Sequence, residues 1–229
     1  MFLAQAIGSV FNIYYNLIHI PPVLTPAQAS SFKTSIALFN GIAYPPLAAI
    51  WALTVFRLRC PASDAVMLTR QRHTVINLPL IAAIIAATGW FLSIPALFIG
   101  LKFSGEPINT HVYFHFPVSI CIASVVALTI GYFSIDWARR KLLFPYFFRD
   151  TSPSQIKGAF RLSIAGRGKL WTISASICPI FSLLLILISP EPMESDYWFA
   201  AAVAGAGILC ALISSALMAR LVITPVEEL

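Results

Sequence analysis

The chain has 229 residues, of which 59% are hydrophobic and only 10% are charged, and its mean hydropathy is +0.83. Soluble domains carry about 25% charged residues, so this composition excludes an ordinary soluble domain and predicts a surface that faces lipid. A membrane-spanning helix needs about 20 apolar residues, so the length accommodates about six or seven spans and little else. We therefore expect an all-α, polytopic membrane protein.

Apolar runs separated by polar breaks predict six transmembrane helices along the chain. The first run is interrupted by Gln5, Asn12 and Asn16, and the sixth is rich in Gly, Ala and Ser. The predicted spans are residues 1–20, 34–56, 77–100, 112–138, 171–189 and 197–222.

The basic residues are distributed unevenly between the two sides of this topology. Thirteen of the fifteen Lys and Arg residues fall in the loops after the second and fourth spans or at the end of the sixth, whereas only Lys33 and Lys102 lie on the other side. The positive-inside rule then places both termini in the cytoplasm. Because the net charge of +6 follows from this topology and from contact with anionic lipid headgroups, no nucleic-acid partner is expected.

The connection at residues 139–170 is the one long cytoplasmic loop. Ser154 is a typical helix N-cap residue, and Ile156, Phe160 and Ile164 follow at intervals of four. This spacing predicts an amphipathic helix over residues 154–165 that lies in the membrane interface. The outer loops are short, so no folded extracellular domain is expected.

Asp136 is the one acidic residue in a predicted span. Ionisable groups inside membranes are suspected functional sites, which favours a proton or ion relay as one interpretation. The position near the inner end of the fourth span favours a structural clamp instead, because Arg139 and Arg140 follow at i+3 and i+4. We expect the clamp.

Three asparagines, Asn12, Asn16 and Asn40, place amides inside apolar runs. Such groups commonly join transmembrane helices by hydrogen bonds. The alternative is that they anchor the polar end of a ligand.

His19, His111 and His115 map to the outer membrane boundary, and the last two share one helix face. A metal site or a proton sensor there is the sharper interpretation. Because no carboxylate or cysteine accompanies the three histidines, we expect ordinary interfacial histidines and no bound metal.

The sixth span contains small residues at intervals of four, which favours close helix packing, either inside the bundle or against a second copy of the chain. Arg220 ends the span, and Val222, Val226 and Leu229 follow with the spacing of a coiled-coil seam. Both packing arrangements stay open at this stage.

Several stretches together resemble the six-helix membrane domain of bacterial class III adenylate cyclases of the mycobacterial type, in which a HAMP linker joins the last span to a cyclase domain. They are Leu78-Pro79 after Arg70 and Arg72, the segment from Asp136 to Arg140, the basic approach from Gly158 to Lys169, Pro179, and Arg220 to Leu229 with Pro225 and Glu227 or Glu228. The likeness covers most of the chain in layout and is loose in sequence, and this family more often has glutamate where Asp136 stands.

The resemblance implies a membrane domain over residues 1–222 and the beginning of a HAMP-like linker over 223–229. It implies a homodimer in the bacterial inner membrane that senses a lipid-like, fatty-acid-like ligand. Signal coupling would pass through Arg220, Pro225, Glu227 and Glu228. ATP and Mg or Mn would serve a downstream cyclase domain that synthesises cAMP, and no cofactor is expected in this segment.

Two function classes follow from the sequence. The preferred one is a transmembrane sensor and dimerising anchor, with an adenylate cyclase, a histidine kinase or a phosphatase as its output. The alternative is a small-solute transporter or channel, and a plain anchor without a ligand is a third. No nucleotide-binding or nucleophile motif is present, so the segment itself is not expected to be an enzyme.

Overall fold

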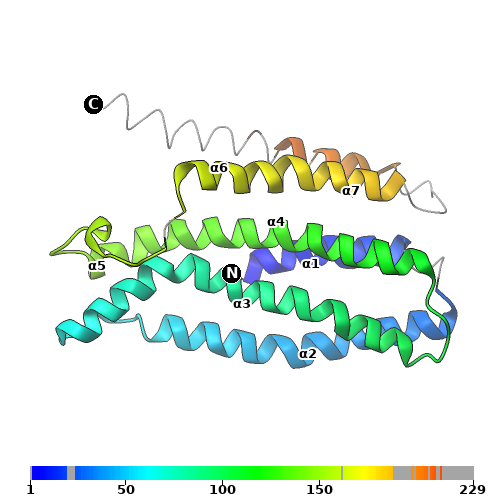
Figure 1. Ribbon diagram of the computed structural model, residues 1–229, viewed down its shortest axis with the longest axis horizontal. Helices are drawn as coiled ribbons and strands as arrows, with labels where there is room; N and C mark the ends of the chain where they lie inside the picture. Colours follow the sequence, from blue (N-terminus) through cyan, green and yellow to red (C-terminus); the bar gives the residue numbers. More distant parts are fainter. Residues whose placement is uncertain are drawn as a thin grey trace.

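The computed structural model describes residues 2–19, 24–160, 162–187, 197–198, 200–205, 207–209 and 212. These residues form helices and connections without any strand (Figure 1), which confirms the all-α prediction. The elements are α1 (Phe2–His19), α2 (Pro26–Phe56), α3 (Ala65–Lys102), α4 (Thr110–Leu142), α5 (Phe144–Phe147), the 3₁₀ turn η2 (Pro153–Gln155), α6 (Ile164–Thr172), the π-helical turn η3 (Ile173–Ile177) and α7 (Cys178–Leu187).

Four described helices are long and apolar enough to cross a membrane. They are α2, α3, α4 and the continuous helix Ala165–Leu187, which combines α6, η3 and α7. This supports a membrane-embedded protein. The predicted first span corresponds to α1, whose polar Gln5, Asn12 and Asn16 set it apart from these four. Most of the predicted sixth span lies outside the described residues.

Capping residues place the starts of the helices earlier than hydropathy does. Thr25 forms a capping box with Gln28, and Asp64 and Asn109 accept hydrogen bonds from the first turns of α3 and α4. The helices α2 and α3 therefore begin eight and twelve residues before the predicted spans. Polar first turns reduce the local hydropathy but are stabilised by their caps.

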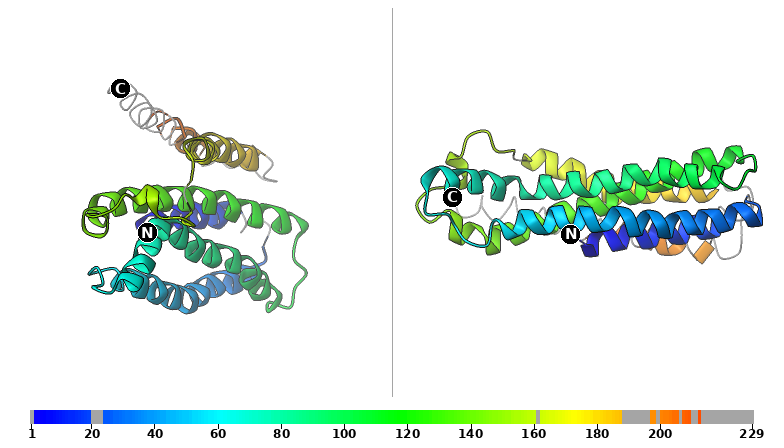
Figure 2. Two further views of the ribbon diagram at one scale, coloured as in Figure 1. Left: turned by 60° about the vertical axis from the view of Figure 1, so that its left-hand side comes forward. Right: turned by 90° about the horizontal axis from the view of Figure 1, so that it is seen from below.

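The helix α4 lies at the centre of the bundle. It packs against α3, α1 and α7, while α2 packs against α3 (Figure 1). Gly8 on α1 permits a close approach, because a Cβ atom there would lie 2.7 Å from the Cβ of Ala127 on α4. Figure 2 shows the same arrangement from two further directions.

The helices α6 and α7 lie along α4 on the side away from α2 (Figures 1 and 2). Tyr15 of α1 joins Ile122, Cys178 and Leu185 in the buried cluster that holds this layer. Residues 200–205 and 207–209 are helical as well, and a Cβ on Gly207 would meet the Cβ of Pro179 at 2.8 Å. In the described part of the chain, this small-residue segment thus packs against α7 of the same chain.

The predicted interfacial helix over residues 154–165 is wrong in the described residues. Only the short turn η2 forms, and Gly158 adopts a positive φ of 76°, which a helix does not tolerate. The backbone N–H of Phe160 donates to Oδ1 of Asn77 on α3 at 2.8 Å. The loop therefore follows a tertiary contact with α3 instead of its own periodicity.

Candidate functional site

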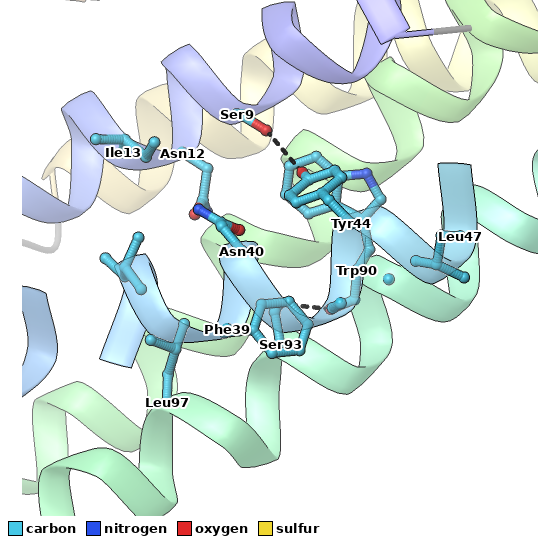
Figure 3. A pocket seen from close by; sticks show the side chains of 13 residues that line it. Ser9, Asn12, Ile13, Phe39, Asn40, Tyr44, Leu47, Trp90, Ser93 and Leu97 are labelled. Carbon is cyan, nitrogen blue, oxygen red and sulfur yellow. Dashed lines mark hydrogen bonds between the residues drawn. The ribbon is translucent and has the colours of Figure 1, made fainter. Parts of the chain in front are cut away.

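A pocket lies between α1, α2 and α3, near the middle of α2 (Figure 3). It exists because α1 packs against α4 whereas α2 packs against α3, so that α1 and α2 diverge above the surface of α3. We refer to it as the α1–α2 pocket. Its lining residues are Ser9, Asn12, Ile13, Ile36, Phe39, Asn40, Ala43, Tyr44, Leu47, Gly89, Trp90, Ser93 and Leu97.

The α1–α2 pocket is small and continues into an apolar extension. Its volume is about 60 Å³, and a second pocket of about 20 Å³ shares Tyr44, Leu47, Gly89 and Trp90 with it. The extension reaches Ile85 and Ala86 on α3 and Ala48 on α2, and Gln5 of α1 is its one additional polar lining residue. Sites for drug-sized molecules measure about 300–1,000 Å³, so this pocket suits the polar end of a narrow molecule whose remaining part is apolar.

The surface around the pocket is apolar and exposed. Val10 on α1 is 68% exposed, and Leu38 and Ile42 on α2 are 63% and 67% exposed. In a membrane, side chains of this kind face acyl chains. A molecule dissolved in the bilayer therefore has an apolar approach to the opening between α1 and α2.

The polar groups in the pocket have unused hydrogen-bonding capacity. Within the described part of the chain, the side-chain amide of Asn40 has no hydrogen-bond partner. Asn12 donates through Nδ2 to Ser119 Oγ at 3.3 Å, and no described residue donates to its Oδ1. In Figure 3 the Asn12 side chain extends from α1 toward Asn40 on α2. The pocket thus offers a donor and acceptors to a bound molecule.

Hydroxyl groups complete the polar side of the pocket. Ser9 Oγ lies 3.5 Å from the hydroxyl oxygen of Tyr44, a long contact that joins α1 to α2. Ser93 donates to the backbone carbonyl of Trp90 at 2.6 Å and keeps its oxygen lone pairs as acceptors. These groups line the pocket beside the two asparagine amides.

Asn16 has a different environment from the other two predicted asparagines. It is 1% exposed, donates to the carbonyl of Asn12 at 2.8 Å and accepts from Ser119 Oγ at 3.1 Å. The bond with Ser119 joins α1 to α4. The structure therefore brings Asn12 and Asn40 together in one pocket and places Asn16 in helix packing.

Trp90 is a lining residue that no sequence pattern singled out. Its Nε1–H donates to Oε1 of Gln5 at 2.7 Å, which connects α3 to α1 beside the pocket. A glutamine in an apolar run was the available signal, because a buried amide requires a partner. The identity of that partner, 85 residues away, follows only from the fold.

Two of the predicted outer histidines lie on α4. His115 is buried and its Nδ1 lies 3.0 Å from the hydroxyl oxygen of Tyr15, while the rings of His111 and His115 are 6.2 Å apart. Tyr15 also donates to the carbonyl of Leu185 on α7 at 3.4 Å. Among the described residues no group of three metal-ligating side chains forms. The side chain of His19 lies outside the described set.

Asp136 lies at the centre of an ion-pair network near the C-terminal end of α4. Its carboxylate pairs with Arg139 and, at 3.1 Å, with Arg140, the i+3 and i+4 positions of the same helix. Arg167 of α6 approaches the same carboxylate at 3.5 Å. We call these four residues the Asp136 network. It connects α4 to α6, a link that spacing alone did not predict.

Arg139 extends the Asp136 network to α3. Its guanidinium donates to the backbone carbonyl of Ile76 and, at 3.4 Å, to that of Val75. A few residues earlier on α3, Arg72 pairs with Asp150 and donates to the carbonyl of Phe147 at 2.7 Å. The ends of α3, α4 and α6 and the chain after α4 are thereby joined on one side of the bundle.

The predicted signal-coupling residues Arg220, Pro225, Glu227 and Glu228 lie outside the described residues. Their role stays a prediction. Comparison of the chain with protein families, with curated proteins and with solved structures finds no match.

Proposed function

We propose that the chain is a membrane-embedded sensory and anchoring domain that binds a lipid-like amphiphile in the α1–α2 pocket. The proposal depends on three observations together: the Asn40 amide and the Asn12 Oδ1 have no hydrogen-bond partner among the described residues, the pocket has a largely apolar extension, and its rim is apolar and exposed. Polar groups are costly inside a membrane unless they find partners or serve a function. An amphiphile supplies both the missing partner and the apolar remainder.

A route from the pocket to the last helix supports a sensing role. The helix α1 carries Ser9 and Asn12 in the pocket and Tyr15 against α7, where Tyr15 bonds to Leu185. Pro179 on α7 in turn contacts the small-residue segment at Gly207. A ligand that prefers one separation of α1 and α2 would shift this packing, provided that it binds the two arrangements with different affinity.

The wider topology and output belong to the same proposal. Six spans with both termini in the cytoplasm of a bacterial cell agree with the thirteen basic residues on one side. Helix six would pass the change through a HAMP-like linker to a cytoplasmic output in a homodimer. The resemblance favours an adenylate cyclase that uses ATP with Mg or Mn, and it is the sole support for that output.

Photolabelling of the chain in liposomes tests the binding function. A single-chain amphiphile that carries a diazirine should label pocket residues of α1 and α2 saturably, and excess unlabelled amphiphile should prevent this labelling. The variant Asn40→Leu should reduce the labelling. The matched control is Thr34→Val on the same helix, because Thr34 is exposed and bonds only to its own helix at Ser30.

The opposite pattern would reject the proposal. Non-saturable labelling spread evenly over lipid-facing residues such as Leu53, Ile84 and Ile99, which are all exposed, indicates ordinary lipid contact without a site. Solute flux through the same liposomes, with no effect of amphiphile, would favour the transporter class instead.

A further inference from the structure

The lining of the α1–α2 pocket carries no charge. Among its thirteen residues there is no Lys, Arg, His, Asp or Glu, and the one titratable group is the phenol of Tyr44. All the polar lining groups are thus neutral amides or hydroxyls.

Charged side chains on the neighbouring helix positions are also remote. Lys33, the one basic residue of α2, lies seven positions before Asn40, which corresponds to about 10 Å along a helix. On α3, Lys102 follows the lining residue Ser93 by nine positions, or about 13 Å. None of the thirteen lining residues offers an ion in the pocket a counter-charge, and these two lysines lie about two helical turns or more from the polar lining residues Asn40 and Ser93.

We infer that the pocket selects an amphiphile whose polar end is uncharged and both donates and accepts hydrogen bonds, as a hydroxyl or primary amide does. This inference rests on the proposed function. The Nδ2–H of Asn40 donates a hydrogen bond to the ligand oxygen, and the Oδ1 of Asn12 or Asn40 accepts a hydrogen bond from the ligand's O–H or N–H. An ionised carboxylate, phosphate or ammonium would lose its hydration without a compensating ion pair, so such ends are excluded.

The inference specifies how a fatty acid would behave. A carboxylic acid is uncharged below its pKa and ionised above it. In water this pKa is about 4.3, and it rises when the acid moves into an apolar medium. A fatty acid therefore enters only in its protonated form. Its affinity falls as the pH rises through the pKa, whereas that of an alcohol or amide stays constant.

A set of twelve-carbon probes tests this selectivity in liposomes of uncharged phospholipid. We use 1-dodecanol, dodecanamide, dodecanoate and dodecylammonium as competitors of the photolabel, with each membrane concentration measured. At about pH 8, well above the carboxyl pKa in water, the alcohol and the amide should compete at membrane concentrations at least about tenfold lower than dodecanoate and dodecylammonium.

Substitutions of lining residues distinguish recognition from simple fit. Asn40→Leu should weaken dodecanamide at least about tenfold. Asn40→Lys supplies a counter-charge and should reverse the preference in favour of dodecanoate. Ser93→Ala keeps the amides and should weaken the alcohol only a few-fold, and Thr34→Val should change nothing. Melting curves check that each variant folds, and Asn12→Leu replaces any Asn40 variant that does not.

Two failures are distinguishable. If dodecanoate competes as well as 1-dodecanol at about pH 8, the neutral-ligand inference is wrong while the binding site stands. If no probe competes and labelling is not saturable, the proposed function itself fails, and the inference fails with it.

Discussion

Removal of the Asp136 carboxylate provides a quantitative test of how much the Asp136 network stabilises the bundle. In the Asp136→Ala variant the guanidinium of Arg139, whose side chain is 5% exposed, loses its carboxylate partner and stays buried against α3. Breaking a buried ion pair by removing one partner destabilises proteins by about 3–5 kcal/mol, because an uncompensated charge is left behind. We expect a loss in this range.

A variant of Arg140, which pairs with the same carboxylate, provides the matched comparison. Arg140 approaches Asp136 at 3.1 Å, but its side chain is 45% exposed. Exposed ion pairs contribute about 0–1 kcal/mol, so Arg140→Ala should change stability little. An ordinary hydrogen bond between membrane helices contributes about 0.6 kcal/mol on average, which is too small to be confused with the effect predicted for Asp136→Ala.

Equilibrium unfolding in mixed micelles of a mild detergent and sodium dodecyl sulfate, followed by circular dichroism, measures these free energies. The double variant Asp136→Ala with Arg139→Ala should lose less than the sum of the two single changes, because the partners form one pair. If Asp136→Ala and Arg140→Ala both lie within about 1 kcal/mol of the parent chain, the carboxylate is not a clamp and our reasoning about its burial is refuted.

Three other predictions concern two helix contacts and the topology. Gly8→Val should lower the free energy of unfolding by about 1–3 kcal/mol because of overpacking against α4. Gly41→Ala should be neutral or stabilising, because a Cβ atom at Gly41 meets nothing within 4 Å. Equal effects of the two changes would contradict the close approach of α1 to α4. Gln5→Leu leaves Trp90 Nε1 without its acceptor and should destabilise by about 0.6–2 kcal/mol in the same assay, and no change would count against that bond. With Cys60 as the single cysteine, a membrane-impermeant maleimide should label it only from the cytoplasmic side, because it is exposed in the loop between α2 and α3; labelling from outside would reverse the proposed topology.

The cores of the long helices were predictable from sequence, and their ends were not. Runs of apolar residues indicate burial in lipid, and they located α2, α3, α4 and the helix Ala165–Leu187 within a few turns. The starts depend on caps at Thr25, Asp64 and Asn109, whose hydrogen bonds stabilise polar turns that hydropathy treats as loop.

The loop before α6 shows why periodicity failed there. Ile156 and Phe160 have helical spacing, but Gly158 takes a left-handed conformation and the backbone of Phe160 bonds to Asn77. A contact with a residue 83 positions away outweighed local pattern. Sequence spacing carries no information on such a contact.

The candidate site was foreseen in part. Asparagines in apolar runs indicate either packing groups or ligand anchors, and the structure contains both. Asn16 bonds to Ser119 in helix packing, Asn12 bonds to Ser119 and also lines the pocket, and Asn40 lines the pocket. Which amide takes which role depends on how α1 leans on α4. That arrangement is a property of three-dimensional packing.

The most direct test of the account is whether an amphiphile contacts Asn40 inside the bilayer. Solid-state NMR on the reconstituted chain, with ¹⁵N in the asparagine amides and ¹³C in the hydroxyl-bearing carbon of 1-dodecanol, measures this proximity through the ¹³C–¹⁵N dipolar coupling. We predict a coupling that saturates with added alcohol and disappears in Asn40→Leu. A coupling that is absent in the parent chain, or that persists unchanged in this variant, would contradict the α1–α2 pocket as a binding site.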